Sequence, residues 1–197
     1  MKNSWDQRYS EPGFAYGRDP NGFFRQVLDG LQPGKILLPG EGEGRNAIYA
    51  ARKHWEVTAF DQSSVARDKA MGWAGSEKLK INYLLADMAD FSCDKPDFDL
   101  VAIIYVHFPP SIRQQIHRKL AACLKPGGMF IIECFHKTQL KYGTGGPPVE
   151  ELLYLEDDLK EDFSELQIIR CENSIVYKKE GKYHAGDSSI IRFIANN

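Results

Sequence analysis

The sequence between residues 35 and 51 predicts a strand, a glycine-rich turn and a helix in this order, and this feature constrains the fold of the chain most. The apolar run 36–38 stops at Pro39, which cannot donate to a hydrogen-bonded ladder, so a buried strand is expected to end there. Glycines then alternate with acids from Gly40 to Gly44, and strong helix formers follow. Glycine adopts positive φ and lets a ligand lie against the backbone, while a helix start offers unpaired N–H groups and a positive dipole end. The segment therefore predicts a ligand-binding turn.

Two kinds of ligand use such a turn. A dinucleotide favours G-x-G-x-x-G/A, which residues 42–47 satisfy, with Asp61 about 20 residues further on. The tighter alternation, with Glu41 and Glu43 between the glycines, favours a cation, because two carboxylates repel a pyrophosphate and attract positive charge.

The sequences EGEGRNA at 41–47 and LKPGGMFIIE at 124–133 carry a resemblance to a known family. The chain resembles the class I S-adenosylmethionine-dependent methyltransferases, and EGEGRNA looks like their tellurite-resistance and thiopurine methyltransferase-like branch. The resemblance implies S-adenosylmethionine, which carries a sulfonium and an ammonium, as cofactor, with its methionine end against the glycine turn.

The expected fold is α/β: a Rossmann-like, doubly wound, mostly parallel sheet of seven strands with an antiparallel C-terminal hairpin, in a single domain. The apolar run 98–105 is expected to be the central strand, followed by a helix over 111–124 and a strand over 129–135. Further helices are expected over 20–31 and 152–163, and the hairpin pairs 166–177 with 189–195. We divide the domain into an N-terminal lid and helix segment (1–34), a cofactor-binding core (35–135), and a substrate loop with the hairpin (136–197).

Acids follow the next two expected strands. Asp61, after 57–60, is placed to accept from both ribose hydroxyls, and a helix N-cap is its alternative role. Asp87 follows the strand 81–86; by resemblance it accepts from the adenine amino group, beside an N–H and an apolar wall from Met88, and a solvated turn is the alternative.

Arg45 is expected to pair with Glu43, Glu41 or the cofactor carboxylate. We hypothesise that Glu41 contacts the cofactor ammonium. The full set of candidates for cofactor binding is Gly40, Glu41, Gly42, Gly44, Arg45, Asn46, Asp61, Gln62, Asp87, Met88 and Tyr105.

Methyl transfer from a sulfonium has a neutral leaving group, so a protein mainly has to align the reactants and exclude water. A soft anionic acceptor needs no base, whereas an amine or hydroxyl can use one. The catalytic candidates are His107 and His136, each of which can instead be a structural histidine, and Tyr16, an aromatic residue in a glycine-flanked lid. The candidates for contact with the acceptor are Phe14, Phe108, Gly145, Gly146 and His184.

Composition excludes several partners. With 197 residues and a net charge of -2, the chain fits one domain and favours neither nucleic acid nor an anionic membrane surface. The four cysteines form no C-x-x-C, so no zinc or other metal site is expected and reduced thiols in the cytoplasm are the default. No segment resembles a signal peptide or a membrane span. The expected partner is a small-molecule substrate, and no oligomeric state is specified.

Two other functions are compatible with the sequence. Tyr49 and Lys53 spell the Y-x-x-x-K of short-chain dehydrogenases, although they lie in the first helix, too early for that catalytic pair. A nicotinamide-dependent oxidoreductase is therefore the main alternative. A cofactor-binding sensor or partner subunit without turnover is the other.

Overall fold

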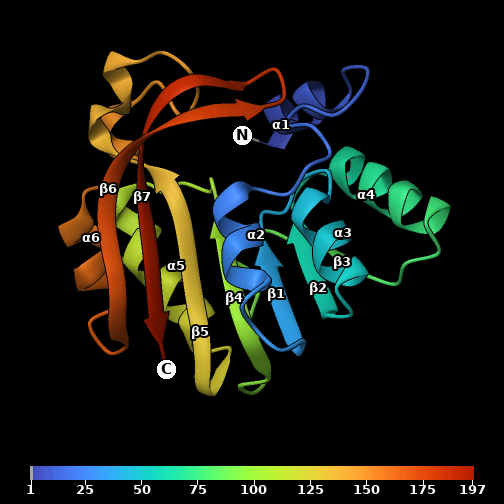
Figure 1. Cartoon of the computed structure of the whole chain (residues 1–197), viewed down its shortest axis with the longest axis horizontal. Coiled ribbons are helices and arrows are strands. Elements are labelled where there is room, and N and C mark those ends of the chain that lie inside the picture. The colour runs from blue at the N-terminus through green and yellow to red at the C-terminus, as the bar shows by residue number, and fades with distance from the viewer. Residues whose placement is uncertain (1) are drawn as a thin grey trace.

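A seven-stranded sheet forms the centre of the molecule (Figure 1). The structure is a computed structural model that describes residues 2–197, with side chains from Trp5 onward. The strand order is β3-β2-β1-β4-β5-β7-β6. The strands β1 to β5 pair in parallel with their neighbours, whereas β7 pairs antiparallel with both β5 and β6. The expected α/β fold with an antiparallel C-terminal hairpin is confirmed. The strands are β1 (Lys35–Pro39), β2 (Glu56–Asp61), β3 (Asn82–Leu85), β4 (Phe98–Ile104), β5 (Leu124–Phe135), β6 (Gln167–Glu180) and β7 (His184–Asn196).

Helices cover both faces of the sheet. In Figure 1, α2 and α3 lie in front of it and α5 and α6 behind it. The helices are α1 (Lys2–Tyr9), α2 (Gly22–Leu28), α3 (Arg45–Arg52), α4 (Ser64–Ser76), α5 (Pro110–Ala121) and α6 (Glu156–Asp162), with short 3-10 turns η1 (Lys137–Lys141) and η2 (Glu150–Leu152).

The strand β4 is central in the sheet, as its apolar sequence predicts. Leu100 and Ala102 point into one core layer, with Phe24 of α2, while Val101 and Ile103 point into the other, with α5 and α6. Because successive side chains of a strand alternate between faces, a strand covered on both sides is apolar throughout. The two core layers therefore pack on both faces of the parallel strands and fix the position of their carboxyl ends.

Several element boundaries differ from the expectation. The helix α1 was not expected in the aromatic N-terminal segment, and the expected helix 152–163 is reduced to α6 with η2 before it. The hairpin strands are longer than expected, so only residues 181–183 turn between β6 and β7. The strand β5 begins at Leu124 and not at residue 129 as expected. Its pairing with β4 is irregular between Phe98 and Leu100, and this irregularity accommodates residues 125–128.

The cysteines contradict the expectation of four reduced thiols. Cys93 and Cys123 form a disulfide, with their Cα atoms 5.6 Å apart, whereas Cys134 and Cys171 are free. The two cysteines are 30 residues apart, so the sequence gives no sign that they pair. They meet because the fold brings the loop after β3 against the end of α5. The disulfide ties that loop to the core.

Candidate active site

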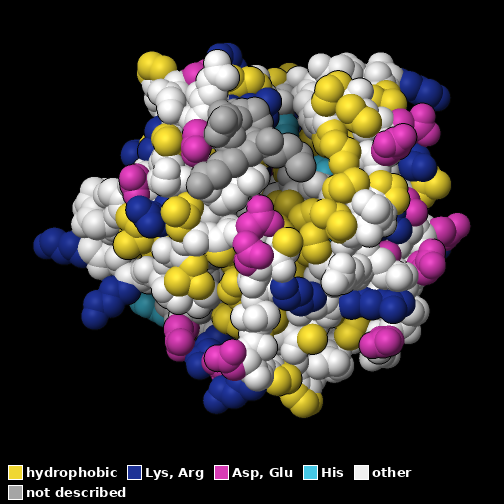
Figure 2. Space-filling model, turned by 180° about the vertical axis from the view of Figure 1, so that it is seen from behind, with side chains coloured by type: hydrophobic (Ala, Val, Ile, Leu, Met, Phe, Trp, Pro, Cys, Tyr) yellow, Lys and Arg dark blue, Asp and Glu magenta, His cyan; other side chains and the backbone are white. Residues whose placement is uncertain are grey.

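A cleft of about 580 Å³ opens at the carboxyl ends of the parallel strands. It is lined by the turn after β1, the ends of β2, β3 and β4, the helix α1 and the loop before η2. Figure 2 shows hydrophobic side chains and histidine around this hollow. Ligands of open parallel sheets bind at this edge, beside the strands where the order reverses, which here are β1 and β4.

The glycine turn is held in a conformation that other residues disfavour. Gly40, Gly42 and Gly44 have φ of 64°, 63° and 90°. A Cβ on Gly40 would lie 2.5 Å from a methyl carbon of Val106, so the backbone approaches its neighbours closely. The Gly42 carbonyl accepts from the Tyr83 hydroxyl at 2.5 Å, and its N–H donates to Asp61 at 3.0 Å. The turn is therefore fixed before any ligand arrives, and it lines the cleft through Gly40 and Gly42.

Glu41 caps the helix that follows the turn. Its Oε1 accepts from the backbone N–H groups of Asn46 and Ala47, both at 2.7 Å, and its Oε2 accepts from the Asn46 side chain at 3.3 Å. Burial raises the pKa of Glu41 to about 7, against the lowering effect of these donors. Glu41 also lines the cleft, but its oxygens serve α3, which the sequence did not indicate.

The other two charged residues of the turn face different partners from those expected. Glu43 accepts from the backbone N–H of Ala15 at 2.6 Å and from Lys69 Nζ at 2.8 Å, which fastens the N-terminal segment to α4. Arg45 pairs with Glu180 of β6 rather than with Glu41 or Glu43. Gly44 is the N-cap of α3 and packs on Ala70, outside the cleft.

The two acids at the strand ends lie in the same cleft. Asp61 ends β2 and accepts from the N–H groups of Gly42 and Ser63. The side chain of Ser63, not that of Asp61, caps α4 by accepting from Ala66 N–H at 3.1 Å. Asp87 is exposed after β3 and accepts from the Ala89 N–H at 2.9 Å. Gln62 and Met88 line the cleft beside them.

Aromatic rings form part of the wall of the cleft. The His184 ring lies 4.6 Å from Tyr16, 4.6 Å from Tyr105 and 5.2 Å from Phe135, measured between centroids. Gly145 and Gly146 pass directly over this cluster, since a Cβ on Gly146 would lie 2.8 Å from the Phe135 ring. The wall contains the expected Tyr16, Tyr105, Phe108, Gly145, Gly146 and His184.

His107 lines the cleft but is fixed by the backbone on both sides. Its Nδ1 lies 2.7 Å from the Leu152 carbonyl, to which it donates, and its Nε2 accepts from the Phe135 N–H at 3.3 Å. Burial lowers the pKa of His107 to about 4, so the ring is neutral. Both nitrogens are occupied, which makes His107 a poor proton acceptor.

Two candidates lie outside the cleft. His136 is the N-cap of η1, with Nδ1 near the Thr138 hydroxyl at 2.7 Å and Nε2 3.4 Å from Glu156. Phe14 packs edge-on against Trp73, with ring centroids 5.2 Å apart. His136 follows β5 as expected, but its ring contacts Thr138 and Glu156, and Phe14 packs on Trp73 of α4.

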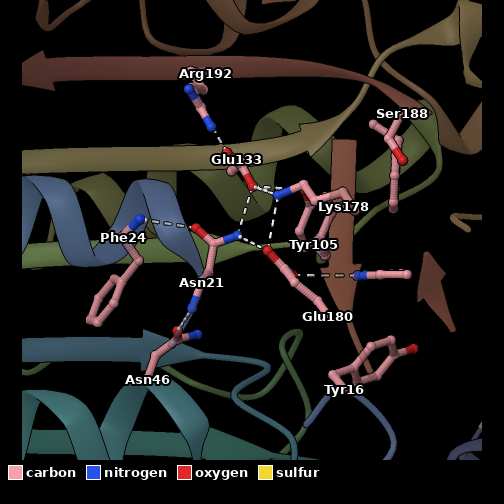
Figure 3. A network of polar contacts seen from close by, with 12 residues as sticks. Tyr16, Asn21, Phe24, Asn46, Tyr105, Glu133, Lys178, Glu180, Ser188 and Arg192 are labelled. Atoms are coloured by element: carbon pink, nitrogen blue, oxygen red, sulfur yellow. Dashed lines mark hydrogen bonds and ion pairs between the residues drawn. The ribbon is translucent and has the colours of Figure 1, made fainter. Parts of the chain in front are cut away.

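A buried charge network behind the aromatic wall was not expected from the sequence (Figure 3). Glu133, fully buried at the end of β5, accepts from Asn21, Tyr105, Lys178 and Arg192. Burial alone would raise the pKa of Glu133, but Lys178 and Arg192 hold it below its ordinary value. Glu133 lies within β5, and the acid that follows the apolar residues of the sequence FIIE was the available signal for it.

The helix α1 supplies cleft residues that were also missed. Trp5 and Tyr9 stack with their ring centroids 5.6 Å apart, and a Cβ on Gly42 would lie 2.8 Å from the Tyr9 hydroxyl. Arg8 lies between them in sequence and lines the cleft with both. Aromatic residues four apart, which share one face of a helix, were the available signal.

Two further observations concern metals and membranes. Among residues 2–197 no group of three or more histidine, cysteine or acidic side chains is arranged to hold a metal ion. Within the same part of the chain, no helix combines the length and apolarity needed to cross a bilayer.

Comparison with known proteins shows which class this chain resembles. Residues 36–128 match the family described as a methyltransferase domain. The fold, with this match at the glycine turn and the strand-end acids, makes the chain similar to the class I S-adenosylmethionine-dependent methyltransferases, whose cofactor is S-adenosylmethionine.

Within this class the chain is similar to several named proteins. It is 32% identical over 111 residues to a ubiquinone biosynthesis O-methyltransferase of Rickettsia akari (strain Hartford), covering 56% of this chain and 44% of that one. It is 26% identical over 159 residues to thiocyanate methyltransferase 1 of Brassica oleracea, covering 79% of this chain and 65% of that one. The chain thus spans less than two thirds of the length of these relatives.

Solved structures show the same fold at lower identity. TehB from Haemophilus influenzae superimposes with a TM-score of 0.75 at 16% identity, covering 100% of this chain and 66% of that one. The N-methyltransferase NodS from Bradyrhizobium japonicum WM9, in complex with S-adenosyl-L-homocysteine, gives a TM-score of 0.75 at 16% identity, covering 100% and 97%. These structures share the fold that the resemblance to the class I methyltransferases and their tellurite-resistance branch implied.

Proposed function

We propose that this chain transfers a methyl group from S-adenosylmethionine to a soft nucleophilic atom, such as the sulfur of a thiol, on a small molecule. One observation carries the proposal: a single cleft joins the glycine turn and the acids Asp61 and Asp87 to a wall of aromatic rings. The relative from Brassica oleracea is named as a methyltransferase of thiocyanate, which supports an acceptor containing sulfur.

In this proposal the cofactor lies along the strand ends. Its methionine part meets the turn at Gly40 and Gly42, its ribose meets Asp61 and Gln62, and its adenine meets Asp87 and Met88. Residues 1–34 cover it, 35–135 bind it, and 136–197 contact the acceptor. Bound there, the cofactor supplies an electrophilic methyl group.

The aromatic wall supports a soft acceptor, because it offers little base. His107 is neutral and bonded at both nitrogens, and burial lowers the pKa of His184. A weak base serves an acceptor that ionises readily, such as a thiol, better than an amine or an aliphatic hydroxyl. The rings also exclude water and present polarizable surface to the sulfur.

The test uses three acceptors of one shape. The protein is incubated with labelled S-adenosylmethionine and with 4-methylthiophenol, 4-methylphenol or 4-methylaniline, and S-adenosyl-L-homocysteine is quantified. We expect the thiol to be methylated fastest. Preference for the phenol or the aniline would contradict the soft acceptor. Retention of a nicotinamide dinucleotide instead of S-adenosylmethionine would favour the oxidoreductase, and cofactor binding without turnover of any acceptor would favour a sensor.

A further inference from the structure

We propose that Arg8 forms a binding subsite for an anionic group of the acceptor, so that the molecule methylated here carries a carboxylate in addition to its nucleophilic atom. This inference rests on the proposed function, because it names a substrate class for the same cleft.

The guanidinium of Arg8 is held in a fixed orientation. Its Cζ lies 4.8 Å from the ring centroid of Trp5 and 4.5 Å from that of Tyr183, and Nη1 donates to the Tyr16 hydroxyl at 2.8 Å. The contacts come from α1, from the loop after it and from the turn between β6 and β7. A cation placed by three separate segments loses little conformational freedom when it binds an anion.

The charge of Arg8 is not neutralised within the described part of the chain. Arg8 and Arg45 are the two arginines that line the cleft, and Arg45 is paired with Glu180 at 2.9 Å. Nearby Lys182 pairs with Glu11 at 2.7 Å, whereas no carboxylate lies within ion-pair distance of Arg8 among the residues whose side chains are described. A guanidinium has five N–H donors in a planar fork that matches a carboxylate, and the bond to Tyr16 uses one of them.

The position of Arg8 favours the acceptor over the cofactor. One of the side chains that hold Arg8, Tyr16, belongs to the aromatic wall: its ring lies 4.6 Å from His184 and 6.0 Å from Tyr183, which also contacts Arg8, measured between ring centroids. The cofactor side of the cleft carries Asp61 and Asp87. The cleft is thus acidic at the strand ends, and beside the aromatic wall it has a cation without an ion-pair partner among the described side chains. An acceptor with a thiol at one end and a carboxylate at the other matches this distribution.

The experiment compares two aryl thiols of similar shape, one of which carries a carboxylate. KM is measured for 4-mercaptobenzoate and 4-methylthiophenol with the wild type, Arg8→Gln, Arg8→Lys and, as a control, Arg67→Gln, whose guanidinium pairs with Asp68 on the exposed face of α4. We expect the wild type and Arg67→Gln to favour the carboxylate compound by about tenfold or more, the size of a charge-assisted hydrogen bond. Arg8→Gln loses this preference, and Arg8→Lys retains part of it.

Calorimetry separates the acceptor from the cofactor. The affinity for S-adenosyl-L-homocysteine is expected to be equal in the wild type and Arg8→Gln. If Arg8→Gln weakens this affinity and leaves the preference between the thiols intact, Arg8 binds the cofactor carboxylate and the inference is overturned.

Binding of the methylated product tests the subsite without turnover. 4-(Methylthio)benzoate is titrated into the complex with S-adenosyl-L-homocysteine, with 4-methylthioanisole as the neutral counterpart. If no thiol is methylated but the carboxylate compound binds the wild type and not Arg8→Gln, the methyl-transfer proposal fails and the subsite stands. Equal binding of both compounds to both proteins would overturn the subsite alone.

Discussion

Arg45 and Glu180 form a largely buried ion pair, with Nη2 and Oε2 2.9 Å apart, across 135 residues of sequence. Arg45 begins α3, where the helix dipole disfavours a cation, and Glu180 ends β6. The pair therefore compensates the unfavourable position of Arg45 at the start of a helix, and it holds the C-terminal hairpin against the glycine turn.

Replacing Glu180 with Gln should destabilise the fold, because it leaves the charge of Arg45 without its partner and removes one of the two carboxylates that pair with Lys178. We expect a loss of about 3 kcal/mol in the free energy of unfolding, measured in urea at pH 7. The control is Glu172→Gln, which removes an exposed pair with Arg170 on the same strand and should cost less than about 1 kcal/mol. Equal losses in the two variants would contradict a special role for the buried pair.

The same pair predicts an acid dependence. Burial would raise the pKa of Glu180, but His184, Arg45 and Lys178 outweigh it and hold the pKa well below its ordinary value. Because the folded pKa lies below the unfolded one, the stabilisation is present above the unfolded pKa and is lost as the pH falls below it. Wild-type stability should therefore fall more steeply with acid than that of Glu180→Gln, measured by urea unfolding from pH 6 to pH 3.

Glu41 predicts a dependence in the opposite direction. Its folded pKa of about 7 exceeds the unfolded value of 4.5, so its contribution is complete below the unfolded pKa and is lost as the pH rises through the folded one. At about 1.4 kcal/mol for each pKa unit, this amounts to about 3 kcal/mol between pH 4 and pH 8. Glu41→Gln, which keeps an oxygen for the helix cap, should show a smaller decline in urea unfolding, whereas the exposed Glu165→Gln should behave like the wild type.

The same variant tests the ammonium contact hypothesised for Glu41. If Glu41 contacts the cofactor, calorimetry should show weaker binding of S-adenosyl-L-homocysteine to Glu41→Gln. Unaltered affinity would restrict the residue to its observed role as the cap of α3.

Alanine at two glycines should have opposite effects. Gly44 has a φ of 90°, and a Cβ there would lie 2.7 Å from the Ala70 Cβ, so Gly44→Ala forces α3 and α4 apart. We expect a cost of about 2 to 4 kcal/mol from backbone strain and overpacking. Gly72, within α4, has nothing within 4 Å of its Cβ position, and Gly72→Ala should stabilise the helix by about 0.5 to 1 kcal/mol. Thermal and urea unfolding of both variants check the prediction, which a loss of stability in Gly72→Ala would refute.

Removing the disulfide should lower stability. Joining Cys93 to Cys123 closes a loop of about 30 residues, for which loop closure in the unfolded chain accounts for about 3 to 4 kcal/mol. Cys93→Ser, or reduction of the wild type with dithiothreitol, should therefore lower the thermal midpoint. Cys171→Ser, which removes a free thiol, keeps the sensitivity to the reductant. A wild-type midpoint that the reductant leaves unchanged would refute the stabilising role.

Some parts of the site follow from residues that are neighbours in sequence. The end of β1 at Pro39, the positive φ of Gly40 and Gly42, and acids at the ends of β2 and β3 are local properties that composition and periodicity encode. Because parallel strands end at one edge of a sheet, these local signals also predicted a common cleft for Asp61 and Asp87.

The partners of individual side chains were decided by the tertiary structure. Glu41 turns back to cap α3, Arg45 meets Glu180, and the ring nitrogens of His107 are taken by the backbone of Leu152 and Phe135. The sequence by itself determined where chemistry-bearing residues stand along each element. Only packing determined what each one touches, because a hydrogen bond or ion pair depends on distances of a few ångströms between segments far apart in the chain.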